Sequence, residues 1–414
     1  MFLFGLAYGV ATVIFLLVVH HMDITTETAK SYFPFAQSVL EGTIPDIEYP
    51  PLALVFITIP GFFASTPEGY SVAFAIMAYL FFLMGLVLAA KFAKRSNQSQ
   101  YLAMLAYTVM MLLMLEFVLD RYDIFPMIMT MLSLYCFITK RYTWAWVILS
   151  IATMTKLYPA VLMPVYLMMF LMDRDWKGAF KGIAVYALVA LAVILPVLLL
   201  GSDTISYFYG YHMDRPLQLE STAASLIAVL AILGLTTVGV EFTSGSDNLI
   251  GAWPDAVAPF LTPLTIVVLL VLYAVAAYVI VRMKRSGLDN ENNRMVILGV
   301  TLFAAVALFV SVGKVFSAQY MVWLIPLVLF LMMTTLDHFL TRRIFIIFLV
   351  AEVLTQVNFA VNFGLYNGEF NEIGMMVLLV RNILMFVLLF LAFKGLRDHL
   401  FGARGRTRFQ YRKL

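Results

Sequence analysis

Cysteine is almost absent from this chain of 414 residues, in which Cys136 stands alone. A single cysteine excludes an intramolecular disulfide framework and any metal site built from several thiolates. No spacing of His, Asp and Glu matches a metal-ligand pattern either. The sequence therefore predicts no required metal and no cofactor.

Charge is also scarce, because only 12% of the residues are charged and 63% are hydrophobic. An ordinary soluble domain has roughly 25% charged residues. One soluble core of this size could not bury so much apolar surface, whereas lipid can solvate it. The composition predicts an integral membrane protein.

The first apolar run, residues 2–19, lacks the marks of a cleaved signal peptide. No basic segment precedes it, and His20-His21-Met22-Asp23 is not a small-residue cleavage site. We expect it to stay in the protein as a first transmembrane helix.

Long apolar runs are abundant, and a membrane-spanning helix needs about 20 predominantly apolar residues. Twelve runs qualify, some of them short: 2–20, 69–91, 101–118, 124–139, 142–157, 159–172, 179–200, 257–281, 296–313, 320–336, 344–361 and 374–393. Two shorter stretches, 51–65 and 221–237, follow prolines. We interpret both as juxtamembrane or re-entrant helices on the extracytoplasmic face.

The distribution of Lys and Arg supports twelve spans with both termini in the cytoplasm. This arrangement places 21 of the 27 basic residues on the cytoplasmic side and 16 of the 24 acidic residues on the outer side. Counting 51–65 as a span would move Lys91, Lys94 and Arg95 outside. The predicted fold is an all-α, polytopic transmembrane helical bundle.

The expected organisation has four parts. Residues 1–200 form a core with a first outer loop at 21–68. A second large outer loop with a re-entrant helix follows at 201–256, then further transmembrane helices at 257–393 and a basic cytoplasmic tail at 394–414.

Six basic residues do not fit the cytoplasmic set: Lys30, Arg121, Lys156, Arg215, Lys314 and Arg381. All except Arg381 fall at the outer end of a helix or in an outer loop. Cations near the membrane are costly and usually face a cavity, a partner or a ligand. The five could bind an anionic lipid headgroup, or each could pair with a nearby carboxylate. Arg381 is expected to pair with Glu352 or with another helix.

Acidic residues occur close to these cations. The first outer loop contains Glu27 at the beginning of a predicted short helix, 27–41, with Thr25 or Thr26 as its cap. A carboxylate beside a membrane-bound sugar phosphate could deprotonate an acceptor hydroxyl, although outer-loop carboxylates are commonly just solvated. The turn Asp120-Arg121-Tyr122-Asp123 could cap the next helix, or orient a donor phosphate or the first loop.

Five segments in this order resemble the GT-C membrane glycosyltransferases, and most closely glycosyltransferase family 87. They are Tyr32–Gly42 leading to Glu48–Ala53, Arg121–Pro126, Thr155–Pro159, His212–Ser221, and Lys314–Tyr320 leading to Trp323. Together the resembling region covers residues 27–323, and four of the five segments contain one of the misplaced cations.

The resemblance implies a GT-C-like fold and an inverting transfer of a hexose, with mannose the first candidate. The donor would be a polyprenyl-phosphate-linked sugar and the acceptor an extracytoplasmic glycan or glycolipid. The implied surroundings are a lipid bilayer, most simply a prokaryotic plasma membrane, and no nucleic acid.

The resemblance also implies site residues. A catalytic carboxylate would lie just before Tyr32, but Thr28 stands where the family usually has an aspartate, so Glu27 is the first candidate and Asp23 the second. The expected ligands of the donor phosphate are Lys156, Arg215, Lys314 and Arg121. The expected substrate-lining residues are Tyr49, Asp123, His212, Gln218, Glu220, Gln319 and Tyr320.

Three other functions fit parts of the pattern. A secondary transporter also buries charge, but it often has paired halves with helices broken near the midplane, and these halves do not match. A non-catalytic scaffold or flippase-like partner would tolerate neutral residues at Glu27 and Asp23. Another GT-C transferase or a lipid-linked oligosaccharide ligase would use a related site.

Overall fold

The computed structural model describes residues 1–21, 26–199, 204–359 and 370–402. Two compact units make up the chain. Unit 1 comprises residues 1–163, 176–215 and 321–326, and unit 2 comprises 164–175, 216–320 and 327–414. Asp23 lies outside the described residues.

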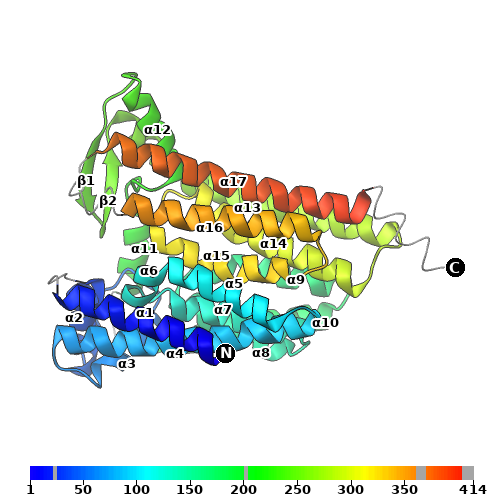
Figure 1. Ribbon diagram of the computed structural model, residues 1–414, viewed down its shortest axis with the longest axis horizontal. Coiled ribbons are helices and arrows are strands. Elements are labelled where there is room, and N and C mark those ends of the chain that lie inside the picture. The colour runs from blue at the N-terminus through cyan, green and yellow to red at the C-terminus, as the bar shows by residue number, and fades with distance from the viewer. Residues whose placement is uncertain (22–25, 200–203, 360–369, 403–414) are drawn as a thin grey trace. The chain divides into compact units, whose positions relative to one another are not determined.

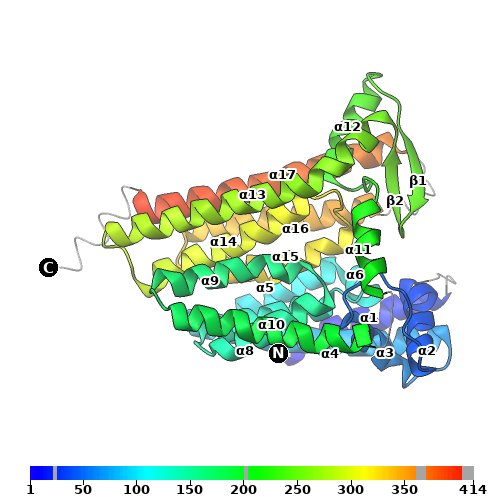
Figure 2. The same ribbon diagram turned by 180° about the vertical axis from the view of Figure 1, so that it is seen from behind.

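The secondary-structure elements described in unit 1 are all helices (Figures 1 and 2). Its elements are α1 (Phe2–His21), the π-helical segment η1 (Thr28–Tyr32), α2 (Phe33–Leu40), α3 (Ala53–Gly61), α4 (Pro67–Arg95), α5 (Gln100–Leu113), α6 (Leu115–Asp120), α7 (Ile124–Ile138), α8 (Tyr142–Thr155), η2 (Tyr158–Leu162), α10 (Trp176–Leu199) and α11 (Thr204–Asp214). The first turns of α15 (Met321–Met332) also belong to this unit.

Small residues allow the helices of unit 1 to approach closely. Helix α4 packs against α1, α5 and α7. A Cβ atom at Gly85 of α4 would lie 2.1 Å from the Tyr107 hydroxyl and 2.6 Å from Ile128, so no side chain fits there. Helices α8 and α10 lie side by side (Figure 2), and Gly182 gives room to the buried indole of Trp146.

The described part of the predicted first outer loop packs onto unit 1 and contains the expected short helix. The Thr26 hydroxyl accepts the backbone N–H of Ala29 at 3.2 Å, which is the contact expected of a helix cap. Further along, the Leu52 N–H donates to the Met154 carbonyl at the end of α8, and Tyr70 of α4 donates to the Ile57 carbonyl of α3. These bonds attach the loop to the ends of the long helices.

Unit 2 contains helices and one hairpin (Figure 1). Its elements are α12 (Thr222–Ile232), β1 (Gly239–Thr243), β2 (Ser246–Ile250), α13 (Ala252–Arg285), α14 (Glu291–Val312), η3 (Ala318–Tyr320), α16 (His338–Phe359) and α17 (Glu372–Phe401), with all but the first residue of α9 (Met163–Met172) and the second half of α15.

The hairpin is a structural element that the sequence analysis did not predict. Strands β1 and β2 pair antiparallel through a two-residue turn at Ser244-Gly245, where both residues have positive φ. This backbone conformation suits a tight hairpin turn and favours glycine. The hairpin, α12 and the first turns of α13 and α17 share a core that includes Leu217, Leu219 and Leu249.

Apart from this hairpin, the described residues confirm an all-α fold of the membrane type. Six helices are long and apolar enough to cross a membrane: α1, α4, α10, α13, α14 and α17. The other predicted spans also contain helices, but shorter or less apolar ones, and the number of twelve spans stays a prediction. The short stretches 51–65 and 221–237 contain α3 and α12, two short helices as expected.

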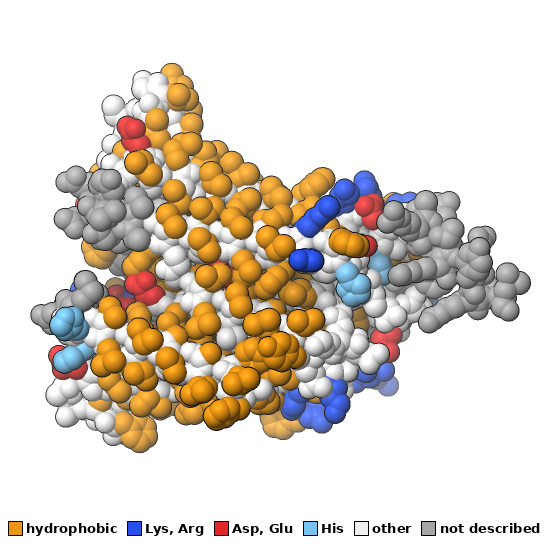
Figure 3. Space-filling model, viewed as in Figure 1, with side chains coloured by type: hydrophobic (Ala, Val, Ile, Leu, Met, Phe, Trp, Pro, Cys, Tyr) orange, Lys and Arg blue, Asp and Glu red, His pale blue; other side chains and the backbone are white. Residues whose placement is uncertain are grey.

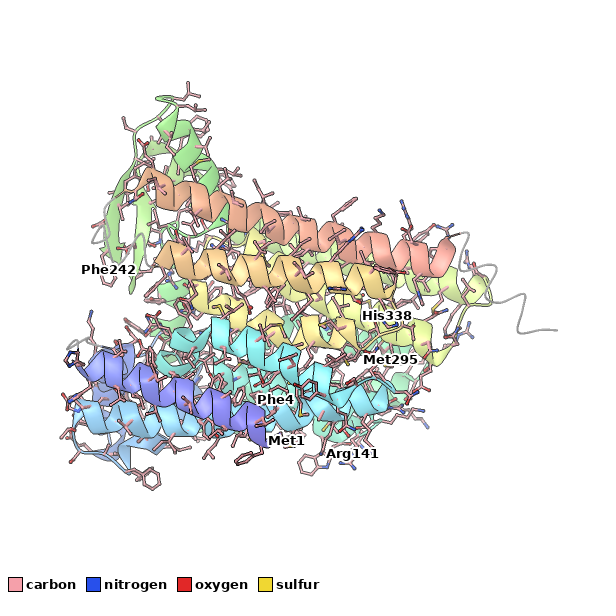
Figure 4. All side chains as sticks on the ribbon, viewed as in Figure 1. Met1, Phe4, Arg141, Phe242, Met295 and His338 are labelled. Atoms are coloured by element: carbon pink, nitrogen blue, oxygen red, sulfur yellow. The ribbon has the colours of Figure 1, made fainter. Side chains whose placement is uncertain are left out.

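Charged residues gather at the helix ends of each unit. In unit 2, α13 and α17 both begin beside α12, and their opposite ends carry Arg282, Lys284, Arg285, Lys394 and Arg397. Hydrophobic side chains cover the exposed face of α17 before this basic end (Figure 3). Figure 4 shows Phe242 at the hairpin, and Met295 and His338 near the other end of the same unit.

Candidate active site

The turn between α6 and α7 forms the centre of the candidate site in unit 1. Arg121 has an extended backbone conformation and ends α6, so Asp120 and Asp123 on its two sides have different surroundings. Asp120 belongs to a group of contacts with the first outer loop. Asp123 belongs to a second group with Lys156 and Trp323.

Asp120 holds the first outer loop. Its carboxylate accepts the backbone N–H groups of Glu27 and Thr28, each at 3.0 Å, and the Thr28 hydroxyl at 3.1 Å. Burial raises the pKa of Asp120, against the opposing effect of Arg121 and these hydrogen bonds. Of the three roles predicted for the turn, this contact favours orientation of the first loop.

Thr28 is part of the attachment and not a candidate base. Its buried hydroxyl contacts Asp120, the Ser71 hydroxyl at 2.9 Å and the Thr26 hydroxyl at 2.9 Å. A hydroxyl engaged in this way anchors η1 to α4 and does not replace a carboxylate chemically.

Glu27 lies one residue earlier and keeps a partly exposed carboxylate. Arg121 forms an ion pair with it at 3.2 Å and with Asp120 at 3.6 Å. The guanidinium therefore fixes the position of the carboxylate that the sequence analysis named as the first candidate base. These contacts favour a positioning role for Arg121 over direct binding of a donor phosphate.

Lys156 follows the last residue of α8, and its extended backbone aims it toward the turn. Its ammonium lies 2.7 Å from Asp123 Oδ1, and the same oxygen accepts the Trp323 indole N–H at 2.6 Å. Asp123 is fully buried, and its Oδ2 atom has no hydrogen-bond partner among the described residues. Asp123 thus holds Lys156 in place, and it is too buried to line a substrate pocket in this structure.

Aromatic rings surround the Lys156 ammonium. It lies 4.5 Å from the centre of the Tyr122 ring, 5.3 Å from that of Trp323 and 5.8 Å from that of Tyr49. Tyr32 of η1 packs edge-on against both Tyr49 and Tyr122, at 6.3 and 6.0 Å between ring centres. The aromatic residues join the Glu27 and Lys156 groups into one cluster within unit 1.

Two more predicted residues, His212 and Arg215, also belong to unit 1. His212 lies in the last turn of α11, and Arg215 directly follows that helix. The His212 ring nitrogen Nε2 lies 3.1 Å from the Glu48 carbonyl, next to Tyr49. The Arg215 guanidinium packs over the Tyr211 ring at 5.5 Å. His212 therefore links α11 to the loop segment that carries Tyr49.

The remaining predicted residues belong to unit 2. Gln218 and Glu220 are buried, and both side chains bond to the segment 314–318 that follows α14. Lys314 is largely buried, while Gln319 and Tyr320 are half-buried in η3. Gln218 and Glu220 thus support the main chain that carries Lys314, a contact which the sequence pattern did not predict.

Arg381 of α17 contacts the turn that precedes α12 and not Glu352, the partner named first. It donates to the Glu220 carbonyl at 2.6 Å, and no ion pair with Glu352 forms among the described residues. Both Glu352 carboxyl oxygens are buried there without a hydrogen-bond partner. Neither expected partner of Arg381, Glu352 or another helix, is the one observed, because Glu220 lies in the turn before α12.

Several residues of the cluster were missing from the predicted site. Tyr122, Tyr158 and Trp323 were read only as parts of motifs, yet Tyr158 stacks on Trp323 with ring centres 4.3 Å apart. Tyr122 and Tyr158 had a signal in the sequence, because each lies within two positions of a misplaced cation, whereas Trp323 has no charged residue that close. No group of three or more His, Cys, Asp or Glu side chains in the described ranges could hold a metal ion.

Comparison with known proteins identifies the family of the chain. Residues 48–312 match the profile of Glycosyltransferase family 87. No curated protein matches the chain. The match covers well over half of the chain and includes the 120–123 turn, Lys156, Arg215 and Gln218. This multi-pass membrane protein belongs to glycosyltransferase family 87 and is a membrane glycosyltransferase.

Proposed function

We propose that the protein transfers a hexose, with mannose the first candidate, from a polyprenyl phosphate to an extracytoplasmic glycan or glycolipid. The supporting observation is the cluster of unit 1, in which a carboxylate held by Arg121 and an ammonium held by Asp123 meet around the Tyr32, Tyr49 and Tyr122 rings. Membership of a glycosyltransferase family favours group transfer over transport.

The proposed reaction is a single displacement with inversion. The acceptor oxygen attacks the anomeric carbon while the bond from that carbon to the phosphate oxygen breaks, and the electron pair stays on the phosphate. The Glu27 carboxylate takes the proton of the acceptor hydroxyl, with Asp23 as the second candidate. Negative charge grows on the leaving phosphate, so fixed cations lower the barrier most.

Lys156 is the cation whose position is best defined. Asp123, Trp323 and the surrounding rings fix the ammonium before any substrate binds, so its orientation costs little during the reaction. Arg215 and Lys314 are proposed to contact the donor phosphate as well. Tyr49, His212, Gln319 and Tyr320 are proposed to line the sugar and acceptor side.

The proposed orientation places the cluster on the extracytoplasmic face of a prokaryotic plasma membrane, with twelve spans and both termini in the cytoplasm. Basic ends of helices support it, because Lys and Arg remain preferentially in the cytoplasm. In unit 1, Lys91 near the end of α4 packs over the Tyr135 ring near the end of α7.

A transfer assay with defined donors tests the proposal. The purified protein in lipid nanodiscs would receive radiolabelled polyprenyl-phosphate mannose, or the corresponding glucose donor, with candidate glycans and glycolipids. We expect labelled product from the mannose donor and a raised Tm in its presence. Absence of turnover and of thermal protection with every donor would refute the proposal.

Two pairs of variants test the proposed roles of Glu27 and Lys156. Glu27→Gln should retain donor protection and lose turnover, whereas the exposed Glu41→Gln, in the same loop, should remain active. Lys156→Met should weaken donor protection and lower the rate by about 10² to 10³, as removal of a single charge-stabilising contact does. The exposed Lys177→Met is its matched control.

A further inference from the structure

The segment between α14 and η3 in unit 2 is held by two side chains from another part of the chain. The Phe316 N–H donates to Gln218 Oε1 at 2.7 Å, and the Ala318 N–H donates to Glu220 Oε2 at 3.2 Å. Gln218 also donates from its backbone to the Lys314 carbonyl at 3.1 Å. The main chain from Lys314 to Ala318 is therefore fixed by residues 218 and 220.

Arg381 holds this arrangement from α17. Its Nη2 donates to the Glu220 carbonyl at 2.6 Å, and its guanidinium lies 3.8 Å from the centre of the Phe316 ring. The neighbouring Asn382 contacts the same carbonyl at 3.4 Å and the Ser225 hydroxyl at 3.1 Å. One guanidinium thus touches both the supporting residue and the supported segment.

Stability alone does not account for an arginine here. Arg381 is fully buried, and its Nε and Nη1 atoms have no hydrogen-bond partner among the described residues. A buried charge in the membrane is costly, and apolar residues of similar volume are often as stabilising or more so. A flat group that stacks on Phe316 and donates to Glu220 at once is what arginine supplies and other side chains do not.

We propose that Arg381 is a positioning residue for the transfer reaction. Through Glu220 and Phe316 it fixes the main chain of residues 314–318, and it thereby holds the Lys314 ammonium where it contacts the donor phosphate. This inference rests on the proposed function, specifically on the role of Lys314. It adds a residue outside the region that matches the family profile.

The test is a double-mutant cycle read through donor KM, kcat and Tm, with the full-length protein in nanodiscs and radiolabelled polyprenyl-phosphate mannose. Arg381→Met should raise the donor KM about tenfold, within the range of coupling between residues in one network. In a Lys314→Met background the same change should raise KM no further. Additive effects on KM, or an unchanged KM in Arg381→Met, would overturn the proposal.

A second variant covers the case in which Arg381→Met does not fold. Arg381→Lys keeps the charge and loses the flat stacking surface, so it should raise KM by an intermediate factor, about threefold. An unchanged KM would again overturn the proposal. The control Leu378→Met, one turn away on the buried face of α17, should leave KM unchanged.

The experiment distinguishes failure of the proposed role of Lys314 from failure of the positioning role of Arg381. If Lys314→Met alone leaves the donor KM unchanged, the proposed role of Lys314 fails, and the role of Arg381 fails with it. If Lys314→Met raises KM and both Arg381 variants leave it unchanged, only the positioning role of Arg381 fails.

Discussion

At the scale of single residues, the candidate site consists of charges that are each fixed by a neighbour. Arg121 fixes Glu27, and Asp123 fixes Lys156. From the sequence, a cation bound to a carboxylate and a cation bound to a phosphate were alternatives. The structure shows the two cations paired with carboxylates, and such a pair also fixes the position of a cation, so the two interpretations do not exclude each other.

The Lys156–Asp123 pair should be a strongly coupled contact. Asp123→Asn leaves a buried ammonium without its counter-charge and should destabilise the protein by about 3–5 kcal/mol. Lys156→Met should have a comparable cost, because it leaves the carboxylate unpaired. The double variant should recover part of the loss in chemical unfolding experiments. Additive losses would mean that the two side chains are not coupled.

The raised pKa of Asp120 predicts how the free energy of unfolding depends on pH. The folded state binds the proton more tightly than the unfolded state does. Its contribution to the free energy of unfolding is therefore favourable at low pH and is lost as pH rises through the raised pKa. Asp120→Asn cannot ionise, so the Tm of the wild type relative to this variant should fall over that window. A constant difference in Tm from pH 3 to 7 would contradict this.

At the scale of elements, small residues decide how closely the helices pack. Glycine is ordinarily unfavourable inside a helix, and a hydrophobic pattern does not tell which glycines are needed. Gly85 and Gly182 are needed because the rings of Tyr107 and Trp146 occupy the space beside them. Gly210 of α11 has open space at the same position.

This difference gives a matched pair of variants. Gly85→Ala forces Tyr107 or Ile128 to move and should destabilise unit 1 by about 1–3 kcal/mol, the usual cost of overpacking. Gly210→Ala should be neutral or slightly stabilising, because alanine is the better helix former. Thermal unfolding in detergent measures both. A Gly85→Ala variant as stable as Gly210→Ala would show that the α4–α5 contact adapts freely.

At the scale of the whole molecule, the predicted orientation has a direct test. Cys136 is the single cysteine of the chain. Replacing it with serine gives a cysteine-free background, into which one cysteine at a time can be introduced. A membrane-impermeant maleimide added to intact cells should label Glu241→Cys on the hairpin and leave Gln100→Cys, at the beginning of α5, unlabelled until the membrane is opened. The reverse pattern would overturn the orientation with cytoplasmic termini.

The class of the protein and most of its helices could be predicted from local patterns of residues. Apolar runs and the positions of Lys and Arg are local properties, and lipid acts on them directly, so α1, α4, α13 and α17 could be predicted from their own residues. The cap at Thr26 is equally local. The five segments that resemble the family also indicated it correctly. Four of them contain a cation, and a cation near the membrane is costly unless it has a function or a partner.

The partners of the charged residues depend on the packing of distant segments and could not be predicted. Asp120 with Thr28, Asp123 with Trp323 and Arg381 with Glu220 are separated by 92, 200 and 161 positions. No local pattern encodes such pairs, because a buried polar group accepts any partner that the packing of distant helices brings within reach. The hairpin was missed for a related reason: its strands are short, and they become stable only against α12 and α13.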